Sequence, residues 1–309
     1  MTTRHRRRWT GCGTALVTPF RRNGSVDTDA VRRLAKRQVE AGVHFLVPCG
    51  TTGEAPTLSA EEQRDIVSTV ADAAKGRVPI LAGAGGYDTA AVCRTASEMA
   101  SAGADGLLSV TPYYNKPSQE GLYRHFATIA ESTPLPIVLY DVPGRTGCQM
   151  TVETLARLAE IPTIVGVKQA TGNVTAMCEA LEGTPDDFIV LSGDDALTLP
   201  LMSVGGHGVI SVVSNEAPAD MARMVELAEL GDFVGARAIH CRLLRLMLMN
   251  FVESNPIPVK AAMAAMGLIE AEYRLPLVPP DPRSRARVID ALALAGIESG
   301  QAVPASAAS

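Results

Sequence analysis

Short apolar runs alternate with amphipathic segments along most of this 309-residue chain. The apolar runs are rich in β-branched residues and are mostly followed by Gly, Pro, Asp or Thr, which is typical of parallel strands buried on both faces. On this basis the sequence predicts eight strands, at residues 14–18, 45–49, 79–84, 106–111, 137–142, 164–168, 188–192 and 208–213.

The segments between these strands carry the signals that begin and end helices. Asp27 precedes one apolar periodicity, and Ser59 and Glu62 have the spacing of a capping box. Glycines stand where helices commonly end in the left-handed conformation, at Gly42, Gly76 and Gly103. A strand–helix unit of roughly 30 residues, repeated eight times, predicts an α/β fold of the (β/α)8 TIM-barrel type.

A doubly wound sheet is the alternative architecture. The dinucleotide-binding fingerprint that would favour it is incomplete, because Gly11-Cys12-Gly13 lacks the third glycine at the required offset. The glycine-rich run at 83–86 is not followed by Gly-Lys-Ser/Thr, so it indicates a tight turn rather than a phosphate-binding loop. The barrel therefore remains the favoured fold.

After the eighth strand the pattern becomes wholly helical, which exceeds what a barrel needs. Helices are predicted at residues 218–230, 233–251, 258–267 and 285–295. We expect a flexible basic N-terminal tail at 1–10, the barrel over 11–232, and a C-terminal helical domain and tail over 233–309.

Composition narrows the function further. The net charge of −5 offers no basic field for nucleic acid apart from the arginine-rich run at 4–8, which we expect to be solvated. No apolar run approaches the roughly 20 residues that span a bilayer, and no signal-peptide core follows the basic start. The six scattered cysteines suit reduced thiols in the cytoplasm, and the five histidines never fall at metal-ligand spacing, so we expect no metal.

The candidate chemistry begins at Lys168, one of only five lysines in the chain. It follows the apolar run Ile-Val-Gly-Val at 164–167, so it stands at the polar end of a predicted buried strand. Burial disfavours the ammonium form of a lysine, and a free amine can condense with a carbonyl to give a Schiff base. The alternative is a strand-end lysine that snorkels to solvent.

The other predicted strand ends favour the reactive amine, because chemistry in a barrel collects where the strands end. The second strand ends in Gly-Thr-Thr-Gly-Glu at 50–54, where Thr51 and Thr52 suit a small carboxylate. Other ends carry Tyr113, Tyr114, Tyr140, Asp141, Arg145 and Gly193. Singly, each could be rim packing, a turn or a surface ion pair. Together, an amine, phenols, hydroxyls and a guanidinium suit Schiff-base chemistry on a keto acid.

Two other candidates have less support. A thiol nucleophile at Cys49 or Cys148 would be the first. Lys260 is the rival lysine, but it begins a helix of the C-terminal segment, away from any predicted strand end. We therefore set Lys260 aside as a catalytic residue.

Four motifs resemble the dihydrodipicolinate synthases, which belong with the N-acetylneuraminate lyases to the pyruvate-dependent class I aldolases. They are Gly-Thr-Thr-Gly-Glu at 50–54, Tyr-Tyr-Asn at 113–115, Tyr-Asp-Val-Pro-Gly-Arg-Thr-Gly at 140–147 and Gly-Val-Lys-Gln-Ala-Thr-Gly at 166–172. The resemblance runs from about Gly13 to about Pro279. It implies a barrel with a helical C-terminal domain, assembled as a homotetramer of two tight dimers.

The resemblance also implies an activity, the condensation of pyruvate with L-aspartate-4-semialdehyde that opens the diaminopimelate and lysine branch. No cofactor is implied beyond a covalent pyruvate imine, which Lys168 would form. Tyr140 would donate and accept protons, relayed through Thr51 to Tyr114 of the neighbouring subunit.

The remaining implied roles concern binding. Thr52 and the backbone at Ile210 would hold the pyruvate carboxylate. Arg145 would receive the carboxylate of the aldehyde substrate, and Gly193 would line the same pocket.

The sequence departs from the family pattern beside the lysine. Gln169 stands where many synthases carry an acid, and Asp141 stands where Asn is common. A sugar-acid aldolase like N-acetylneuraminate lyase or 2-keto-3-deoxy-gluconate aldolase is therefore an alternative, although Arg145 and the Asn-Pro-Ile-Pro run at 255–258 favour the synthase. A non-catalytic keto-acid-binding member would be expected to lack Lys168 or Tyr140, and both are present.

A second departure concerns feedback by lysine. Family members that lysine inhibits bind it with histidines, an asparagine and a glutamate, and the positions in register here are Ala60, Gln63, Tyr87 and Ala91. An ammonium effector would find no carboxylate at Ala91, so we expect lysine to inhibit weakly or not at all.

Overall fold

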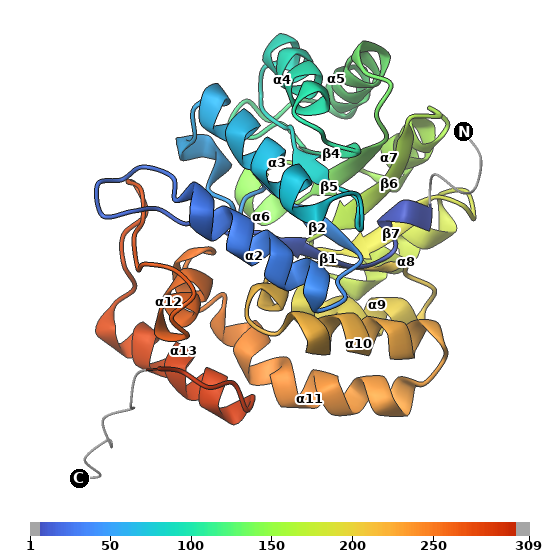
Figure 1. Cartoon of the computed structure of the whole chain (residues 1–309). Helices are drawn as coiled ribbons and strands as arrows, with labels where there is room; N and C mark the ends of the chain where they lie inside the picture. The colour runs from blue at the N-terminus through green and yellow to red at the C-terminus, as the bar shows by residue number, and fades with distance from the viewer. Residues whose placement is uncertain (1–6, 301–309) are drawn as a thin grey trace.

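Eight short, buried strands form one parallel sheet in the computed structural model, which describes residues 7–300 (Figure 1). Their order around the sheet is β2-β1-β8-β7-β6-β5-β4-β3, and a parallel bridge between Leu46 and Ile80 joins the two ends. The predicted TIM barrel is confirmed. The strands are β1 (Gly11–Ala15), β2 (Phe45–Val47), β3 (Leu81–Gly83), β4 (Gly106–Val110), β5 (Ile137–Asp141), β6 (Ile164–Gln169), β7 (Ile189–Ser192) and β8 (Gly208–Ser211).

The first strand begins at Gly11, three residues earlier than the predicted start at Thr14, because Gly11 and Gly13 belong to the strand. A Cβ on Gly13 would lie only 2.1 Å from the ring of Phe45, so the glycine makes room for that side chain inside the barrel. Gly11 is likewise packed against His44. Sequence alone could not separate these close approaches from turn glycines.

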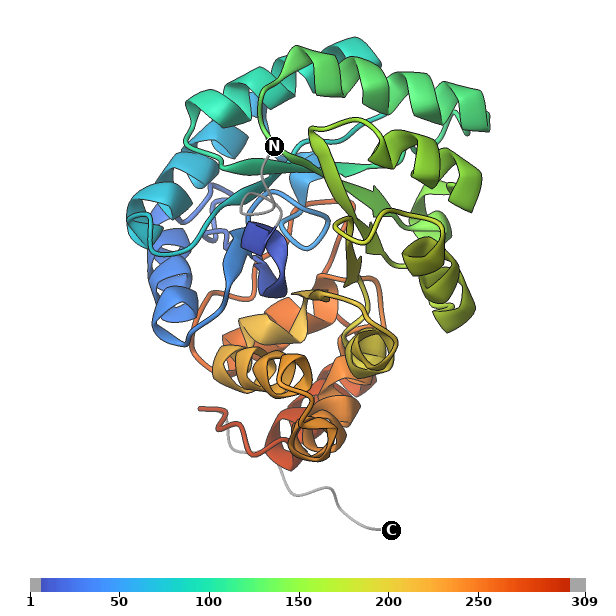
Figure 2. The same cartoon turned by 90° about the vertical axis from the view of Figure 1, so that its right-hand side faces the viewer.

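Helices surround the barrel, and each predicted end signal that we named is present (Figures 1 and 2). Ser59 and Glu62 form the capping box of α3, and the three helix-ending glycines all have positive φ. The helices that follow the strands are α2 (Thr28–Glu40), α3 (Ala60–Ala74), α4 (Thr89–Ser101), α5 (Gln119–Ser132), α6 (Pro143–Thr146), α7 (Val152–Ala159), α8 (Val174–Glu182), α9 (Thr198–Ser203) and α10 (Pro218–Glu229).

The amino-terminal end of the barrel is closed by Trp9, which belongs to the 3-10 helix η1 (Arg7–Trp9). Trp9 is fully buried and meets Phe45 edge-to-face at 5.9 Å between ring centroids. We expected a flexible tail over residues 1–10. Residues 1–6 lie outside the described residues, but 7–10 differ from the expectation, because the indole is held in the barrel interior.

Three further helices, α11 (Phe233–Met249), α12 (Ile257–Ala265) and α13 (Pro282–Leu294), follow the barrel, and α11 lies along α10 (Figure 1). Helices α11 and α13 share one apolar cluster with α10, and Ala262 and Ala265 of α12 belong to it as well. Helix α12 also packs on the barrel, since Val259 and Met263 cluster with Val17 and Val212, which follow β1 and β8. The C-terminal segment therefore reaches the end of the barrel where the strands finish.

Two further findings concern the described residues as a whole. None of their helices is long and apolar enough to cross a membrane. The six cysteines all lie within this part of the chain and none forms a disulfide.

Candidate active site

A cavity of about 450 Å³ opens at the carboxyl ends of β2 to β5. The predicted site residues that line it are Thr51, Tyr140 and Arg145. Gln63 and Tyr113 line it as well, together with the backbone of the glycine-rich run after β3. The cavity lies where a barrel of this type places its chemistry.

Lys168 and Tyr140 are brought together by the pairing of β5 with β6. They are partners in the parallel register, so both side chains point to the same face of the sheet. Tyr140 belongs to the apolar cluster inside the barrel, and the Nζ of Lys168 lies 4.2 Å from the centroid of its ring. Lys168 is only 5% exposed, which argues against a side chain that snorkels to solvent.

Gly193 and Ile210 complete the surroundings of the lysine. A Cβ on Gly193 would lie 2.6 Å from the Cβ of Ala170 and 3.0 Å from the Cε of Lys168, so only glycine fits there. Ile210 lies in β8, is fully buried and belongs to the same interior cluster as Tyr140.

The loop after β2 separates its two threonines. Thr51 lines the cavity, whereas Thr52 is 3% exposed and its Oγ1 accepts a hydrogen bond from the Nδ2 of Asn255 at 2.9 Å. Cys49 and Glu54 flank the pair with φ of 57° and 54°, a left-handed conformation that non-glycine residues rarely adopt. The strained ends of the loop thus fix where both hydroxyls lie.

Arg145 and Tyr114 stand at the rim. Arg145 lies in the short helix α6, and its Nη2 donates to the backbone carbonyl of Asn255 at 3.2 Å. Tyr114 does not line the cavity of its own chain; it is 90% exposed and has a left-handed φ of 72°. The structure therefore brings Thr51, Tyr140 and Arg145 together in one cavity and sets Lys168 beside Tyr140, whereas Tyr114 does not line this cavity.

Lys260 is the main correction to the sequence analysis. It does not lie away from the strand ends, because its Nζ is 2.5 Å from the Oε1 of Glu54 in the loop after β2. Both side chains are fully buried. A lysine within the apolar run of α12 was a signal for such a partner, since a buried charge needs one.

Arg274 is a residue that the sequence analysis missed. It belongs to the C-terminal segment, and its guanidinium binds Glu62 and the backbone carbonyl of Thr57. The residues that flank Arg274 in the sequence give no sign of these contacts, because its partners are more than 200 positions away in the chain.

Two buried titratable groups lie near the candidate site. Burial raises the pKa of the Cys49 thiol to about 12, which disfavours its use as a nucleophile. Burial also raises the pKa of Asp141 to about 7, against a weaker opposing effect of the Met150 backbone N–H. Asp141 and Gln169 are register partners next to Tyr140 and Lys168, so the two sequence departures are neighbours in space.

Among residues 7–300, no group of three or more His, Cys, Asp or Glu side chains comes together as a metal site would require. The groups that the structure does bring to the candidate site are an amine, a phenol, hydroxyls and a guanidinium.

The fold and the site define a TIM-barrel protein with a buried lysine amine at the carboxyl end of β6. The chain belongs to the dihydrodipicolinate synthetase family, whose model matches residues 8–295. The 4-hydroxy-tetrahydrodipicolinate synthase of Koribacter versatilis (strain Ellin345) is 51% identical over 288 residues, which cover 93% of this chain and 96% of that relative.

Solved structures agree with this assignment. The dihydrodipicolinate synthase of Aquifex aeolicus superposes with a TM-score of 0.92 at 40% identity, over 95% of this chain and 100% of that one. The chloride-inhibited dihydrodipicolinate synthase of Acinetobacter baumannii, complexed with pyruvate, gives a TM-score of 0.92 at 42% identity, over 94% of this chain and 99% of that one.

Proposed function

We propose that this protein is a 4-hydroxy-tetrahydrodipicolinate synthase, a lyase that condenses pyruvate with L-aspartate-4-semialdehyde through a Schiff base on Lys168. The observation that carries the proposal is the buried amine of Lys168 beside the ring of Tyr140, at the carboxyl ends of adjacent strands. The names of its relatives and the pyruvate complex of the Acinetobacter baumannii protein support the same substrate.

The first half of the reaction uses pyruvate. The Nζ of Lys168 attacks the ketone carbon, and water leaves to give a protonated imine. The imine draws electrons from the methyl group, so loss of a methyl proton gives an enamine. In the proposal Tyr140 receives that proton, and the relay through Thr51 draws support from the cavity that both residues line.

The second half uses the aldehyde. The enamine carbon attacks the aldehyde carbon, and the aldehyde oxygen gains a proton from Tyr140. The amine of the second substrate then displaces Lys168 from the imine, which closes the ring and frees the enzyme. Arg145 at the rim suits the carboxylate of that substrate, and Thr52 with the Ile210 backbone suits the carboxylate of pyruvate.

Assembly is part of the proposal. We propose a homotetramer of two tight dimers in which Tyr114 acts in the site of the neighbouring subunit. The exposure of Tyr114 and its absence from the cavity of its own chain support this arrangement. A cytoplasmic location is proposed with it, because unpaired cysteines suit a reducing compartment.

Borohydride reduction in the presence of pyruvate tests the central claim. We expect a stable adduct on Lys168, located by mass spectrometry of peptides, and none on Lys260, whose amine is engaged by Glu54. A wild-type protein that gains no adduct, or gains it on another lysine, would contradict the Schiff-base assignment.

The choice of aldehyde is tested separately, by supplying pyruvate with either L-aspartate-4-semialdehyde or the aldehyde of a sugar acid. Turnover should be faster with the short charged substrate, because Arg145 lines a cavity of only about 450 Å³. Preference for the sugar aldehyde would favour the alternative aldolase.

Weak feedback by lysine is also proposed. Tyr87 packs edge-to-face on Tyr113 at 5.2 Å between ring centroids, and Ala60 and Ala91 offer no polar side chain to an amino acid. Half-maximal inhibition by sub-millimolar lysine in a steady-state assay would refute this.

A further inference from the structure

The loop after β2, residues 50–58, is held from outside the barrel by the C-terminal segment. Lys260 of α12 meets the side chain of Glu54 at 2.5 Å, and neither side chain is exposed. The Nζ of Lys260 also lies 4.3 Å from the centroid of the Phe20 ring, so the cation sits in a closed environment. A buried pair of this kind fixes the loop strongly, because separating it would leave a charge unpaired.

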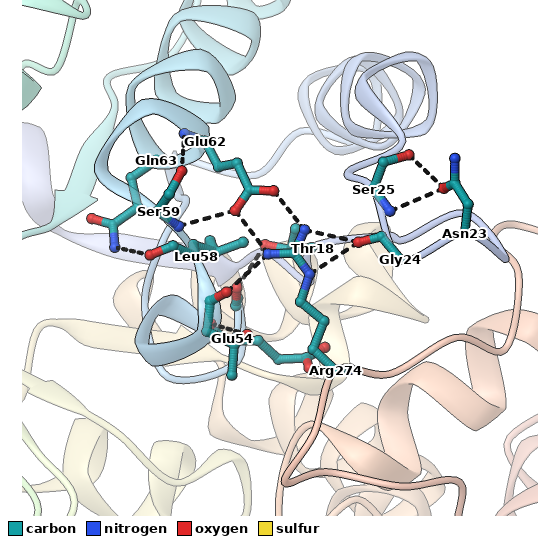
Figure 3. Close-up of polar contacts among 12 residues, drawn as sticks. Thr18, Asn23, Gly24, Ser25, Glu54, Leu58, Ser59, Glu62, Gln63 and Arg274 are labelled. Carbon is teal, nitrogen blue, oxygen red and sulfur yellow. Dashed lines mark hydrogen bonds and ion pairs between the residues drawn. The ribbon is translucent and has the colours of Figure 1, made fainter.

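A second attachment is made by Arg274, shown in Figure 3 between Glu62 and Gly24. All five N–H donors of its guanidinium are used: Nε and Nη2 donate to the carbonyl of Gly24, Nη1 to the carbonyl of Thr57, and both terminal nitrogens to the carboxylate of Glu62. The Cζ of Arg274 stacks 4.4 Å from the Phe20 ring centroid. One side chain thus ties the loops after β1 and β2 to the start of α3.

The pKa values of Glu62 and Arg274 are both shifted in the direction that this ion pair favours. The hydrogen bonds with Arg274 lower the pKa of Glu62, and those with Glu62 raise the pKa of Arg274. Both side chains are partly shielded, at 20% and 29% exposure, so solvent competes only in part. The pair is therefore a fixed link and not a loose surface contact.

We propose that Arg274 and Lys260 are positioning residues for the keto-acid carboxylate: they clamp the loop that carries Thr51 and Thr52. The inference rests on the proposed function. The loop needs such a clamp because Cys49 and Glu54 have left-handed backbones, which persist only where the surroundings over-determine them. A hydroxyl that shifts by about 1 Å loses much of its hold on a carboxylate.

The test substitutes Arg274→Lys, which keeps the positive charge but removes the planar fork of donors. We expect the pyruvate concentration that half-saturates borohydride labelling, and the KM for pyruvate, to rise about 10- to 100-fold. The KM for the aldehyde should stay within about twofold, because Arg145 is held by the backbone of Asn255 and not by Arg274. The value of kcat should fall as well, because the same loop carries Thr51 of the proposed proton relay.

A matched control is Arg242→Lys. Arg242 also bridges a carboxylate and a backbone carbonyl of the C-terminal region, through Asp220 at 2.5 Å and Ala295 at 2.9 Å, but it does not contact the loop. Its kinetic constants should match the wild type, even if its melting temperature falls as far as that of Arg274→Lys.

Glu62→Gln provides a second variant if Arg274→Lys fails to fold. It keeps an acceptor at the same place, and the same selective rise in the KM for pyruvate is expected, about 3- to 10-fold. The folded variant could still be labelled on Lys168 and be half-saturated at a pyruvate concentration within about twofold of the wild-type value. That result would overturn the clamp and leave the proposed function standing. A wild-type protein that pyruvate does not label would overturn both.

Discussion

Asp141 is a buried carboxyl group whose oxygens make no well-formed hydrogen bond to any residue in 7–300. Its pKa is about 7 in the folded chain, against an ordinary value of 3.8. Between these values the unfolded chain releases the proton while the folded chain keeps it, so the free energy of unfolding falls as pH rises. The penalty for ionisation is small well below pH 3.8 and is complete only well above about pH 7.

We therefore expect Asp141→Asn to raise the free energy of unfolding at pH 8 by about 1–3 kcal/mol and to have little effect at pH 4. Denaturant unfolding at several pH values measures this difference. Asp29→Asn is the control, since Asp29 is 78% exposed and its substitution should leave the pH profile unchanged. A gain for Asp141→Asn that is the same at pH 4 and pH 8 would rule out the titration.

Cys49 offers a second prediction at the scale of a residue. It lines the cavity, but its pKa of about 12 keeps it as a thiol at neutral pH. Alkylation by iodoacetamide at pH 8 should therefore modify it at least about 100-fold more slowly than the exposed Cys241. Peptide mass spectrometry with time measures both rates, and comparable labelling of the two would restore a role for the thiol.

At the scale of elements, η1 closes the amino-terminal end of the barrel. Trp9→Ala should cost about 3–5 kcal/mol, because it leaves a cavity against Phe45 and the backbone of Gly106. The shift of the denaturant midpoint measures the cost. Arg8→Ala is the adjacent control: Arg8 pairs with Asp105 at the surface, so the loss should stay under about 1 kcal/mol. Equal losses would mean that the indole does not close the barrel.

The elements that sequence predicted well are those whose pattern is local. The strands from β2 onward lie within the predicted runs or within one residue of them, and the cap at Ser59 forms as its spacing indicates. The predicted first strand left out Gly11 and Gly13, because a close approach across the barrel leaves no local signature. The same reason hid the partners of Lys260 and Arg274, which depend on how the C-terminal segment returns to the loop after β2.

In the candidate site too, the sequence predicted the features that depend on a local pattern and missed those that depend on distant contacts. Lys168 and Tyr140 could be found because each ends a buried strand, and register alone then places them side by side. The different orientations of Thr51 and Thr52 could not, since they depend on the left-handed backbone at Cys49 and Glu54 and on a donor from Asn255.

At the scale of the whole molecule, the exposed ring of Tyr114 makes the assembly testable. Each site in the proposed dimer uses Lys168 of one subunit and Tyr114 of the other. Lys168→Ala and Tyr114→Phe should each be nearly inactive alone. Mixed dimers of the two variants would contain one complete site, with the lysine from the Tyr114→Phe chain and the phenol from the Lys168→Ala chain. Random mixing then restores about a quarter of the wild-type sites.

Co-expression with two affinity tags allows the doubly tagged fraction to be assayed. Where that fraction consists of mixed dimers alone, about half of its sites should be active. If Tyr114 instead served its own chain, every mixed dimer would pair one site without the amine with one site without the phenol, and no activity would return. Mixing two Lys168→Ala chains with different tags controls for contaminating wild type. Recovery in the mixed dimer alone would place the relay across the interface, because no single chain then holds both groups.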